Sequence, residues 1–367
     1  MSVGIDRINY YVPKTYLDLE TLATARNVDL AKYKRGIGQE KMSIPQMHED
    51  IITMAAEAAF PIIKAPEDIS IVFFATESGV DYSKAAAIYL HKLLGLKPTT
   101  KVIELKQACY ALTSALHLAH DYVKNHPNQQ ALVVSSDIAW YGLNTPGEVT
   151  QGAGAIAMVI SEDARLATIT QGITYTSDVP DFYRPNSMEV PVVDGKFSID
   201  CYLDALKKTY QPFDYPYVCF HIPFAKMADK ANASIEPKPM DEAQLSVIKS
   251  VSKEVGNIYN GSLYLALIGV LIKHPRGLEG KTLGMFSYGS GSIGEFFTLT
   301  LTPKYAEVND VTRYQELLSN RTSVSIDDYE KAMNHFVKRE QSLDYQGSKA
   351  SSFSLIKIEN GHRIYER

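Results

Sequence analysis

The chain has 367 residues, of which 22 % are charged and 45 % are hydrophobic, as in an average globular protein. This composition excludes a disordered chain, a collagen-like repeat and a coiled coil. The formal net charge is −5, from 37 basic and 42 acidic residues, so no binding of nucleic acid through bulk charge is expected.

The longest apolar run, Leu263 to Ile272, is about half the length that a membrane helix needs, so no membrane association is expected. The three cysteines, Cys109, Cys201 and Cys219, are too few for a disulfide framework. The first residues lack the basic start and apolar stretch of a signal peptide. Together these features predict a reducing, cytoplasmic location.

Short apolar runs bounded by glycine, aspartate or serine predict strands that are buried on both faces. These runs cover residues 69–75, 131–135, 155–160 and 282–287. Helical patterns lie between them, over residues 50–59, 84–94 and 111–123. The alternation of buried strands with helices predicts a layered α/β fold.

The two halves of the chain share an order of elements. In the first half, a helix after Cys109 precedes the strand at 131–135 and a glycine-flanked strand at 152–157. In the second half, a helix after Asn257 precedes the strand at 282–287 and a glycine-flanked strand at 289–297. A duplicated architecture is one interpretation, although the halves show no obvious sequence identity.

Cys109 is placed where an extended apolar segment changes into a helix. A thiol near a helix N-terminus is expected to favour its thiolate form, which is the nucleophilic form. The alternative is that Cys109 is a small buried apolar residue, as most free cysteines are. Cys201 and Cys219 have no helix start behind them, so both are expected to be structural.

Glu77 and His221 each follow an apolar strand. Ligand sites of α/β sheets gather at the carboxyl ends of strands, and apolar walls would raise the pKa of Glu77 toward that of a general base. A turn carboxylate and a core histidine are the alternatives. The helix after His221 carries Lys226 and Lys230 on one face, where they could hold phosphates or be simply solvated.

The remaining histidines show no metal-binding spacing, and the chain contains neither a Walker loop nor a dinucleotide-binding fingerprint. We therefore expect no metal site and no nucleotide cofactor.

Three segments occur in a characteristic order: Ala75-Thr76-Glu77-Ser78-Gly79-Val80-Asp81, Gln107-Ala108-Cys109-Tyr110 and His221-Ile222-Pro223-Phe224-Ala225-Lys226-Met227. Further segments lie at 36–39, 41–42, 137–139, 181–185, 194–198, 256–259 and 286–291. With this set the chain resembles the 3-hydroxy-3-methylglutaryl-CoA synthase family, in its bacterial form, over nearly its whole length.

The resemblance implies the thiolase fold, a five-layered αβαβα body made of two similar halves. The first half would be residues 1–166, with Glu77 and Cys109. The second would be residues 167–367, with His221, Asn257 and an inserted stretch around 167–220. The fold usually forms a homodimer, which is therefore expected.

The family's activity, as implied by the resemblance, joins acetyl-CoA and acetoacetyl-CoA with water to give 3-hydroxy-3-methylglutaryl-CoA, in the mevalonate route to isoprenoids. Cys109 would carry the acetyl group, Glu77 would remove a methyl proton, and His221 would orient and polarise the second substrate. The CoA thioesters are substrates, and no further cofactor is implied.

Other residues match the family in lesser roles. Those matching substrate-binding positions are Tyr141, Phe182, Lys226, Lys230, Asn257 and Ser290, and those matching supporting acidic positions are Asp137 and Asp181. Two alternatives remain: a polyketide-type synthase that takes acyl groups from carrier proteins, and a non-catalytic thiolase-fold binding protein.

Overall fold

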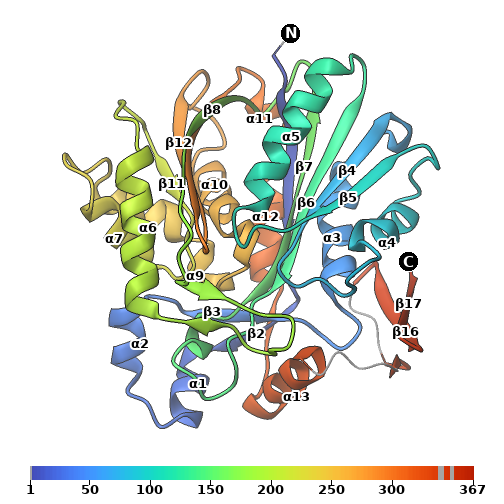
Figure 1. The fold of residues 1–367 in the computed structure, drawn as a ribbon, viewed down its shortest axis with the longest axis vertical. Helices are drawn as coiled ribbons and strands as arrows, with labels where there is room; N and C mark the ends of the chain where they lie inside the picture. The colour runs from blue at the N-terminus through green and yellow to red at the C-terminus, as the bar shows by residue number, and fades with distance from the viewer. Residues whose placement is uncertain (1, 338–342, 348–350) are drawn as a thin grey trace.

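The computed structural model describes residues 2–337, 343–347 and 351–367. Over these residues, nine strands form one mixed sheet in the order β11-β12-β13-β8-β1-β7-β6-β4-β5 (Figure 1). The first-half strands are β1 (Gly4–Tyr11), β4 (Ile69–Ala75), β5 (Lys101–Leu105), β6 (Gln130–Ile138) and β7 (Ala153–Ser161). The second-half strands are β8 (Ala167–Thr176), β11 (Val218–Phe220), β12 (Thr282–Gly289) and β13 (Ile293–Leu301).

The two halves of the sheet are joined only at β1 and β8, where Gly4 lies opposite Thr168 and Ile5 opposite Ala167. Both halves mix parallel and antiparallel pairs. For example, β4 runs parallel to β5 and β6, whereas β7 runs antiparallel to β6. The strands predicted at 69–75, 131–135, 155–160 and 282–287 are confirmed as β4, β6, β7 and β12.

Helices cover both faces of each half. Outside the first half lie α3 (Ile51–Ala59) and α4 (Ala86–Leu93), and α6 (Gly195–Thr209) lies outside the second. The central layer contains α5 (Ala111–Asn125) and α10 (Ser262–Lys273) (Figure 1). Helix α10 is buried from Ser262 to Leu271 because it is apolar all round. The two halves of the sheet are the two β layers, with α5 and α10 between them. The five-layered αβαβα arrangement is therefore confirmed.

Capping residues determine where several helices begin. Asp50 accepts hydrogen bonds from the backbone N–H groups of Ile52 and Thr53 at the start of α3, and Asp194 does the same at the start of α6. Helices α7 (Lys226–Ala233), α8 (Glu242–Lys249) and α9 (Ser252–Val255) follow β11. A 3-10 turn, Tyr259–Gly261, leads directly into α10.

The interpretation of residues 167–220 as an inserted stretch is wrong in two places. Strand β8 pairs with both β1 and β13 inside the central sheet, and α6 forms the outer layer. Only the segment between them departs from the layers. It contains the two-stranded pair of β9 (Phe182–Tyr183) and β10 (Val192–Val193).

Most of the remaining elements pack around one end of the sheet. Strands β14 (Thr322–Ser323), β2 (Thr15–Asp18) and β3 (Lys41–Ile44) form one small sheet, and β15 (Leu343–Asp344), β16 (Ser354–Glu359) and β17 (His362–Glu366) form another. The helices at this end are α1 (Leu19–Ala25), α2 (Leu30–Gly36) and α13 (Ile326–Val337). Helix α12 (Val311–Ser319) packs against α10 and β1, and the short α11 (Tyr305–Val308) lies at the opposite end of the molecule (Figure 1). Across the described residues, no helix combines the length and hydrophobicity needed to cross a bilayer.

Candidate active site

Cys109 and Glu77 lie in direct contact. Glu77 follows the carboxyl end of β4, and Cys109 precedes α5 by two residues. The thiol of Cys109 donates a hydrogen bond to Oε1 of Glu77 over 2.9 Å. Ala108 has a φ of +43°, in the left-handed region that side chains disfavour, so the turn that presents Cys109 is strained. The junction therefore places a thiol, which could act as a nucleophile, against a carboxylate, which could act as a base.

Burial governs the protonation of this pair. It raises the pKa of Glu77 to about 8, and the charge of Asp137 adds to the shift. Burial also raises the pKa of the Cys109 thiol well above its usual value, with the charge of Glu77 as the next cause. Burial and the neighbouring carboxylates therefore oppose the thiolate that the position beside the helix N-terminus was expected to favour.

Asp137 holds the turn that carries Glu77. Its Oδ1 accepts hydrogen bonds from Thr76 Oγ1 at 2.9 Å, from the Glu77 backbone N–H at 2.8 Å and from Ser78 Oγ at 3.1 Å. Its Oδ2 accepts another from Asn260 Nδ2 at 3.1 Å. Burial raises the pKa of Asp137 to about 6. Asp137 thus holds the backbone of Glu77, and its charge raises the pKa of both Glu77 and Cys109.

His221 follows β11 and faces the same cavity as Cys109. Its backbone is fixed on both sides, since its N–H donates to Phe286 O and its carbonyl accepts from Tyr202 Oη, each over 2.8 Å. Burial lowers the pKa of His221 to about 3, so the imidazole is neutral at physiological pH. Its buried Nδ1 has no hydrogen-bond partner among the described residues, which leaves it able to bind a substrate oxygen or a water.

A cavity of about 650 Å³ brings most of the predicted residues together. Its lining includes Cys109, Tyr141, Phe182, His221, Asn257 and Ser290. Glu77 lines an adjoining pocket of about 620 Å³, which shares Phe182 and Ser290 with the first. The two volumes therefore meet at the Cys109–Glu77 pair.

Asn257 and three aromatic rings shape one wall of the cavity. Asn257 Nδ2 donates to Tyr141 Oη over 2.8 Å, and Asn257 Oδ1 accepts from Ser262 Oγ over 2.8 Å at the start of α10. The Tyr141 ring contacts Phe182 edge-on at 6.2 Å and Tyr259 at 6.0 Å between centroids. The wall is thus apolar, with the Asn257 and Tyr141 polar groups fixed against each other.

The two central helices begin at the same place. Asn260, in the turn before α10, accepts a hydrogen bond from the Leu112 backbone N–H of α5 over 3.1 Å. The positive ends of both helix dipoles therefore lie beside Cys109. This arrangement supplies partial positive charge where a thioester oxygen would become negative.

Asp181 lies behind the cavity. It is fully buried and accepts hydrogen bonds from Tyr288 Oη and the Gly291 backbone N–H, each over 2.8 Å. These contacts hold the turn that carries Ser290. Asp181 is not among the residues that line the cavity, and its contacts are with the turn behind it.

Lys226 lies beside a second pocket of about 480 Å³, here called the basic pocket because lysines slightly outnumber the carboxylates that line it, which are Asp18, Glu20, Glu40 and Asp229. The lysines that line it are Lys34, Lys41, Lys226, Lys249 and Lys253. The Lys226 backbone N–H donates to Ile37 O over 2.9 Å, and Ile37 also lines the cavity of Cys109, so the two pockets adjoin. Lys230 is exposed on the next turn and lies outside this lining.

Sequence reasoning missed several of these neighbours. Lys34 and Lys253 are far from Lys226 along the chain, and no local pattern connects them. Arg184 donates a hydrogen bond to the carbonyl oxygen of Glu77. Arg184 lies within the segment 181–185 that carried part of the family resemblance, but nothing in the sequence indicated that its side chain lies beside Glu77. Within the described residues, no cluster of three or more His, Cys, Asp or Glu side chains could hold a metal ion.

Comparison with known proteins covers the whole chain. Family models described as the N-terminal and C-terminal parts of hydroxymethylglutaryl-coenzyme A synthase match residues 1–165, and residues 169–238 and 236–358. The chain is 39 % identical to the hydroxymethylglutaryl-CoA synthase of Enterococcus faecalis, covering 100 % of both proteins. It is 29 % identical to a polyketide biosynthesis 3-hydroxy-3-methylglutaryl-ACP synthase of Bacillus subtilis, covering 94 % of this chain and 92 % of that protein.

Solved structures agree with the sequences. A crystal structure of an HMG-CoA synthase complexed with CoA matches with a TM-score of 0.93 and 36 % identity, covering 100 % of this chain and 99 % of that one. The HMG synthase of the curacin biosynthetic pathway, in complex with a holo donor carrier protein, matches with a TM-score of 0.91 and 27 % identity over 100 % of both chains.

Proposed function

The chain belongs to the hydroxymethylglutaryl-CoA synthase family, and from this premise we propose how its residues carry out the reaction. The protein is a thiolase-fold acyltransferase that condenses acetyl-CoA with acetoacetyl-CoA and water, giving 3-hydroxy-3-methylglutaryl-CoA and CoA, a step of the mevalonate route to isoprenoids. The observation that carries the residue assignment is the 2.9 Å contact between the Cys109 thiol and Glu77, beside a cavity that His221 also lines.

Acetylation begins at Cys109. The sulfur attacks the carbonyl carbon of acetyl-CoA as the thiol loses its proton to water. The carbon–sulfur bond to CoA then breaks, and the departing CoA sulfur takes up a proton from water. Cys109 now carries the acetyl group as a thioester, and Glu77 is kept as the base of the next step.

Condensation uses the same carboxylate as a base. Glu77 removes a proton from the acetyl methyl group, and the resulting enolate carbon attacks the ketone of acetoacetyl-CoA. Neutral His221 donates a hydrogen bond to the ketone oxygen as it becomes negative, and the proton taken up by Glu77 returns through water to that oxygen, which gives the tertiary hydroxyl and restores the carboxylate. Asn257 and Ser290 bind the acetoacetyl group. Tyr141 and Phe182 form the apolar wall beside it. Water then cleaves the thioester to Cys109 and releases the product with a free carboxylate.

The protonation of Glu77 sets the pH dependence of turnover. A pKa of about 8 means that the active carboxylate is the minor form at neutral pH, so the rate is expected to rise with pH and to level off above about 8. His221, with a pKa of about 3, stays neutral throughout and adds no inflection. Steady-state rates between pH 6 and 9, corrected for non-enzymatic thioester hydrolysis, test this. A rate that is flat or falls over that range would contradict it.

The basic pocket is proposed to hold the phosphates of CoA. It lies next to the cavity of Cys109, and Lys226 connects the two. A charged contact to phosphate contributes about 1 kcal/mol at a half-exposed site, so Lys226→Ala is expected to raise the KM for both thioesters about fivefold while kcat changes little. The exposed Lys230, on the next turn, is proposed to contribute less.

Lys357→Ala is the matched control for that substitution. The Lys357 side chain is 41 % exposed and pairs with Glu359, whereas the Lys226 side chain is 44 % exposed and pairs with Asp229. Because Lys357 lies on β16, its loss is expected to leave both KM values unchanged. Equal effects of the two substitutions, measured by initial rates at low salt, would contradict a phosphate site at Lys226.

A second copy of this chain is proposed to cover the β5 edge. Strand β5 ends the sheet and leaves Ile103 43 % exposed, with Ile88 of α4 and Leu118 of α5 also exposed on the flanking helices. An open strand edge with apolar side chains invites pairing with another strand. A homodimer joined edge to edge at β5 would bury these residues.

The acyl donor is proposed to be free acetyl-CoA. The identity to a CoA-dependent relative, 39 %, exceeds the 29 % identity to a carrier-protein-dependent one. Initial rates with acetyl-CoA and with acetyl-carrier protein, each offered acetoacetyl-CoA, test the assignment. Faster turnover with acetyl-CoA is expected, and turnover with the carrier protein alone would instead support a polyketide-type enzyme.

A further inference from the structure

The loop that carries Tyr141 is held by a buried set of polar side chains, Arg26, Glu148, Gln151 and Tyr329, here called the Glu148 network. Arg26 donates to both carboxylate oxygens of Glu148, from Nη2 at 2.7 Å and from Nε at 2.9 Å. Tyr329 Oη donates to Glu148 Oε1 over 3.1 Å and accepts from Gln151 Nε2 over 2.8 Å. The network thus joins α1, α13 and the 3-10 turn Glu148–Thr150.

Gln151 connects the Glu148 network to the backbone of Tyr141. Its Oε1 accepts a hydrogen bond from the Tyr141 backbone N–H over 2.8 Å. At its other end, the Tyr141 hydroxyl accepts from Asn257 over 2.8 Å. Tyr141 is therefore fixed at its backbone by the Glu148 network and at its ring by the active site.

The loop needs such support because its backbone is unfavourable on its own. Gly142 and Asn144 both adopt left-handed conformations, with φ of +92° and +58°. Glu148 Oε2 accepts a hydrogen bond from the Asn144 backbone N–H over 2.9 Å, which holds this turn. Glu148, Gln151 and Tyr329 are each at most 2 % exposed, so removing the Tyr329 hydroxyl leaves Gln151 Nε2 buried without this partner and takes one hydrogen bond from Glu148.

We propose that Tyr329 and Glu148 are positioning residues that set Tyr141 against the cavity of Cys109. Arg26 follows α1 directly and precedes α2, and both helices contribute to the lining of the basic pocket, through Leu19 and Lys34. The network therefore ties the phosphate end of the substrate site to its acyl end. This inference rests on the proposed function, in which Tyr141 forms the wall beside the acetoacetyl group.

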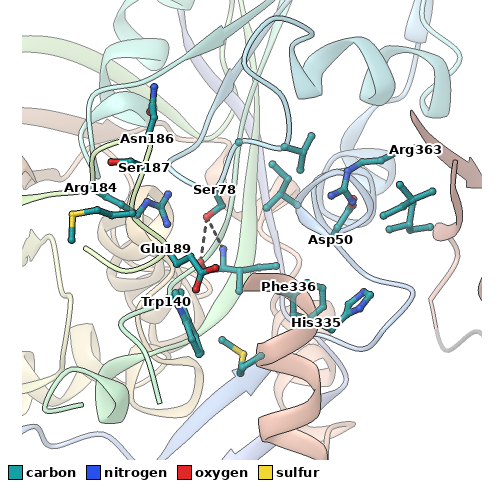
Figure 2. A pocket seen from close by; sticks show the side chains of 18 residues that line it. Asp50, Ser78, Trp140, Arg184, Asn186, Ser187, Glu189, His335, Phe336 and Arg363 are labelled. Atoms are coloured by element: carbon teal, nitrogen blue, oxygen red, sulfur yellow. Dashed lines mark hydrogen bonds and ion pairs between the residues drawn. The ribbon is translucent and has the colours of Figure 1, made fainter. Parts of the chain in front are cut away.

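Trp140 provides a spectroscopic report on the same loop. It is the single tryptophan of the chain, it immediately precedes Tyr141, and it is 8 % exposed. Figure 2 shows Trp140 lining a pocket together with Phe336 of α13, the helix that carries Tyr329. Because indole emission depends on its surroundings, a shift of the loop against α13 changes the fluorescence of the unlabelled protein.

The test compares Tyr329→Phe with Tyr314→Phe. Both substitutions remove the hydroxyl of a fully buried tyrosine. Tyr314 lies on α12, away from the loop, and its hydroxyl donates to Ile8 O of β1 over 2.8 Å. Tyr329→Phe is expected to raise the KM for acetoacetyl-CoA about fivefold, as the loss of a hydrogen bond to a charged group predicts, and to move Trp140 emission to longer wavelength. Tyr314→Phe is expected to change neither, whatever its effect on thermal stability.

A double-substitution cycle shows whether Tyr329 acts through Tyr141. In a Tyr141→Ala background, adding Tyr329→Phe is expected to change the KM for acetoacetyl-CoA by less than about twofold, because coupled positions are not additive. Two outcomes would overturn the inference, provided that the unsubstituted protein forms product. One is that the KM changes caused by Tyr141→Ala and Tyr329→Phe multiply in the double variant. The other is that Tyr329→Phe has the same KM and the same Trp140 emission as Tyr314→Phe. Failure of the unsubstituted protein to form product would instead refute the proposed function.

Discussion

Replacing Cys109 by serine is expected to abolish the acetyl-enzyme and to lower turnover by a factor on the order of 10⁴, as loss of a covalent nucleophile does in other enzymes. The serine hydroxyl is a much weaker acid than a thiol, and burial already opposes ionisation at this position. Intact-mass measurement after treatment with acetyl-CoA checks this. The unsubstituted chain should gain the mass of one acetyl group, and Cys109→Ser should gain none.

The other two cysteines are the controls for this experiment. Cys201 lies in α6 and Cys219 lies fully buried in β11, where burial alone raises the pKa of its thiol. Cys201→Ser and Cys219→Ser should therefore still be acetylated. An acetyl group on the Cys109→Ser chain would refute the assignment of the nucleophile.

Replacing Glu77 by glutamine is expected to separate acetylation from condensation. The charge of Glu77 raises the pKa of Cys109, so its removal makes the thiol easier to ionise, and acetyl-Cys109 should still form. No base remains to remove the methyl proton, so condensation should slow by about 10³-fold or more. Mass measurement follows the first step, and product formation follows the second.

Glu49→Gln is the matched control for that variant. Glu49 is also a buried carboxylate with a pKa raised by burial, to about 7, but its partner is Tyr11 and it lies at the start of α3. Glu49→Gln should retain condensation. A Glu77→Gln chain that cannot be acetylated would contradict the division of roles, because it would make Glu77 essential for ionising the thiol.

The positions of the three proposed catalytic residues in the fold were predictable because each lies at a boundary that the sequence marks. Glu77 and His221 follow the buried strands β4 and β11, and Cys109 precedes α5, so apolar runs and the helical pattern were enough to place them. Their order along the chain then carried the family resemblance. The layered fold followed from the same runs, since strands buried on both faces need helices on both sides.

Features of the site and fold that depend on contacts between distant parts of the chain could not be predicted from the sequence. The Cys109 thiol is held protonated by burial and by carboxylates that only the folded chain brings near it. In the Glu148 network, Arg26 lies 122 positions and Tyr329 lies 181 positions from Glu148 along the chain, and no local sequence pattern marks such pairs. Strand β8 was misplaced for the same reason, because its pairing with β1 is made at the junction of the two halves.

Single-turnover transfer of a labelled acetyl group tests the central claim most directly. The enzyme is treated with ¹³C-acetyl-CoA, freed of excess reagent and then mixed with acetoacetyl-CoA. One 3-hydroxy-3-methylglutaryl-CoA should form for each acetyl group on Cys109, with the label in the arm that ends in the free carboxylate. Release of labelled acetate while acetoacetyl-CoA remains unchanged, or formation of unlabelled product, would contradict condensation through acetyl-Cys109.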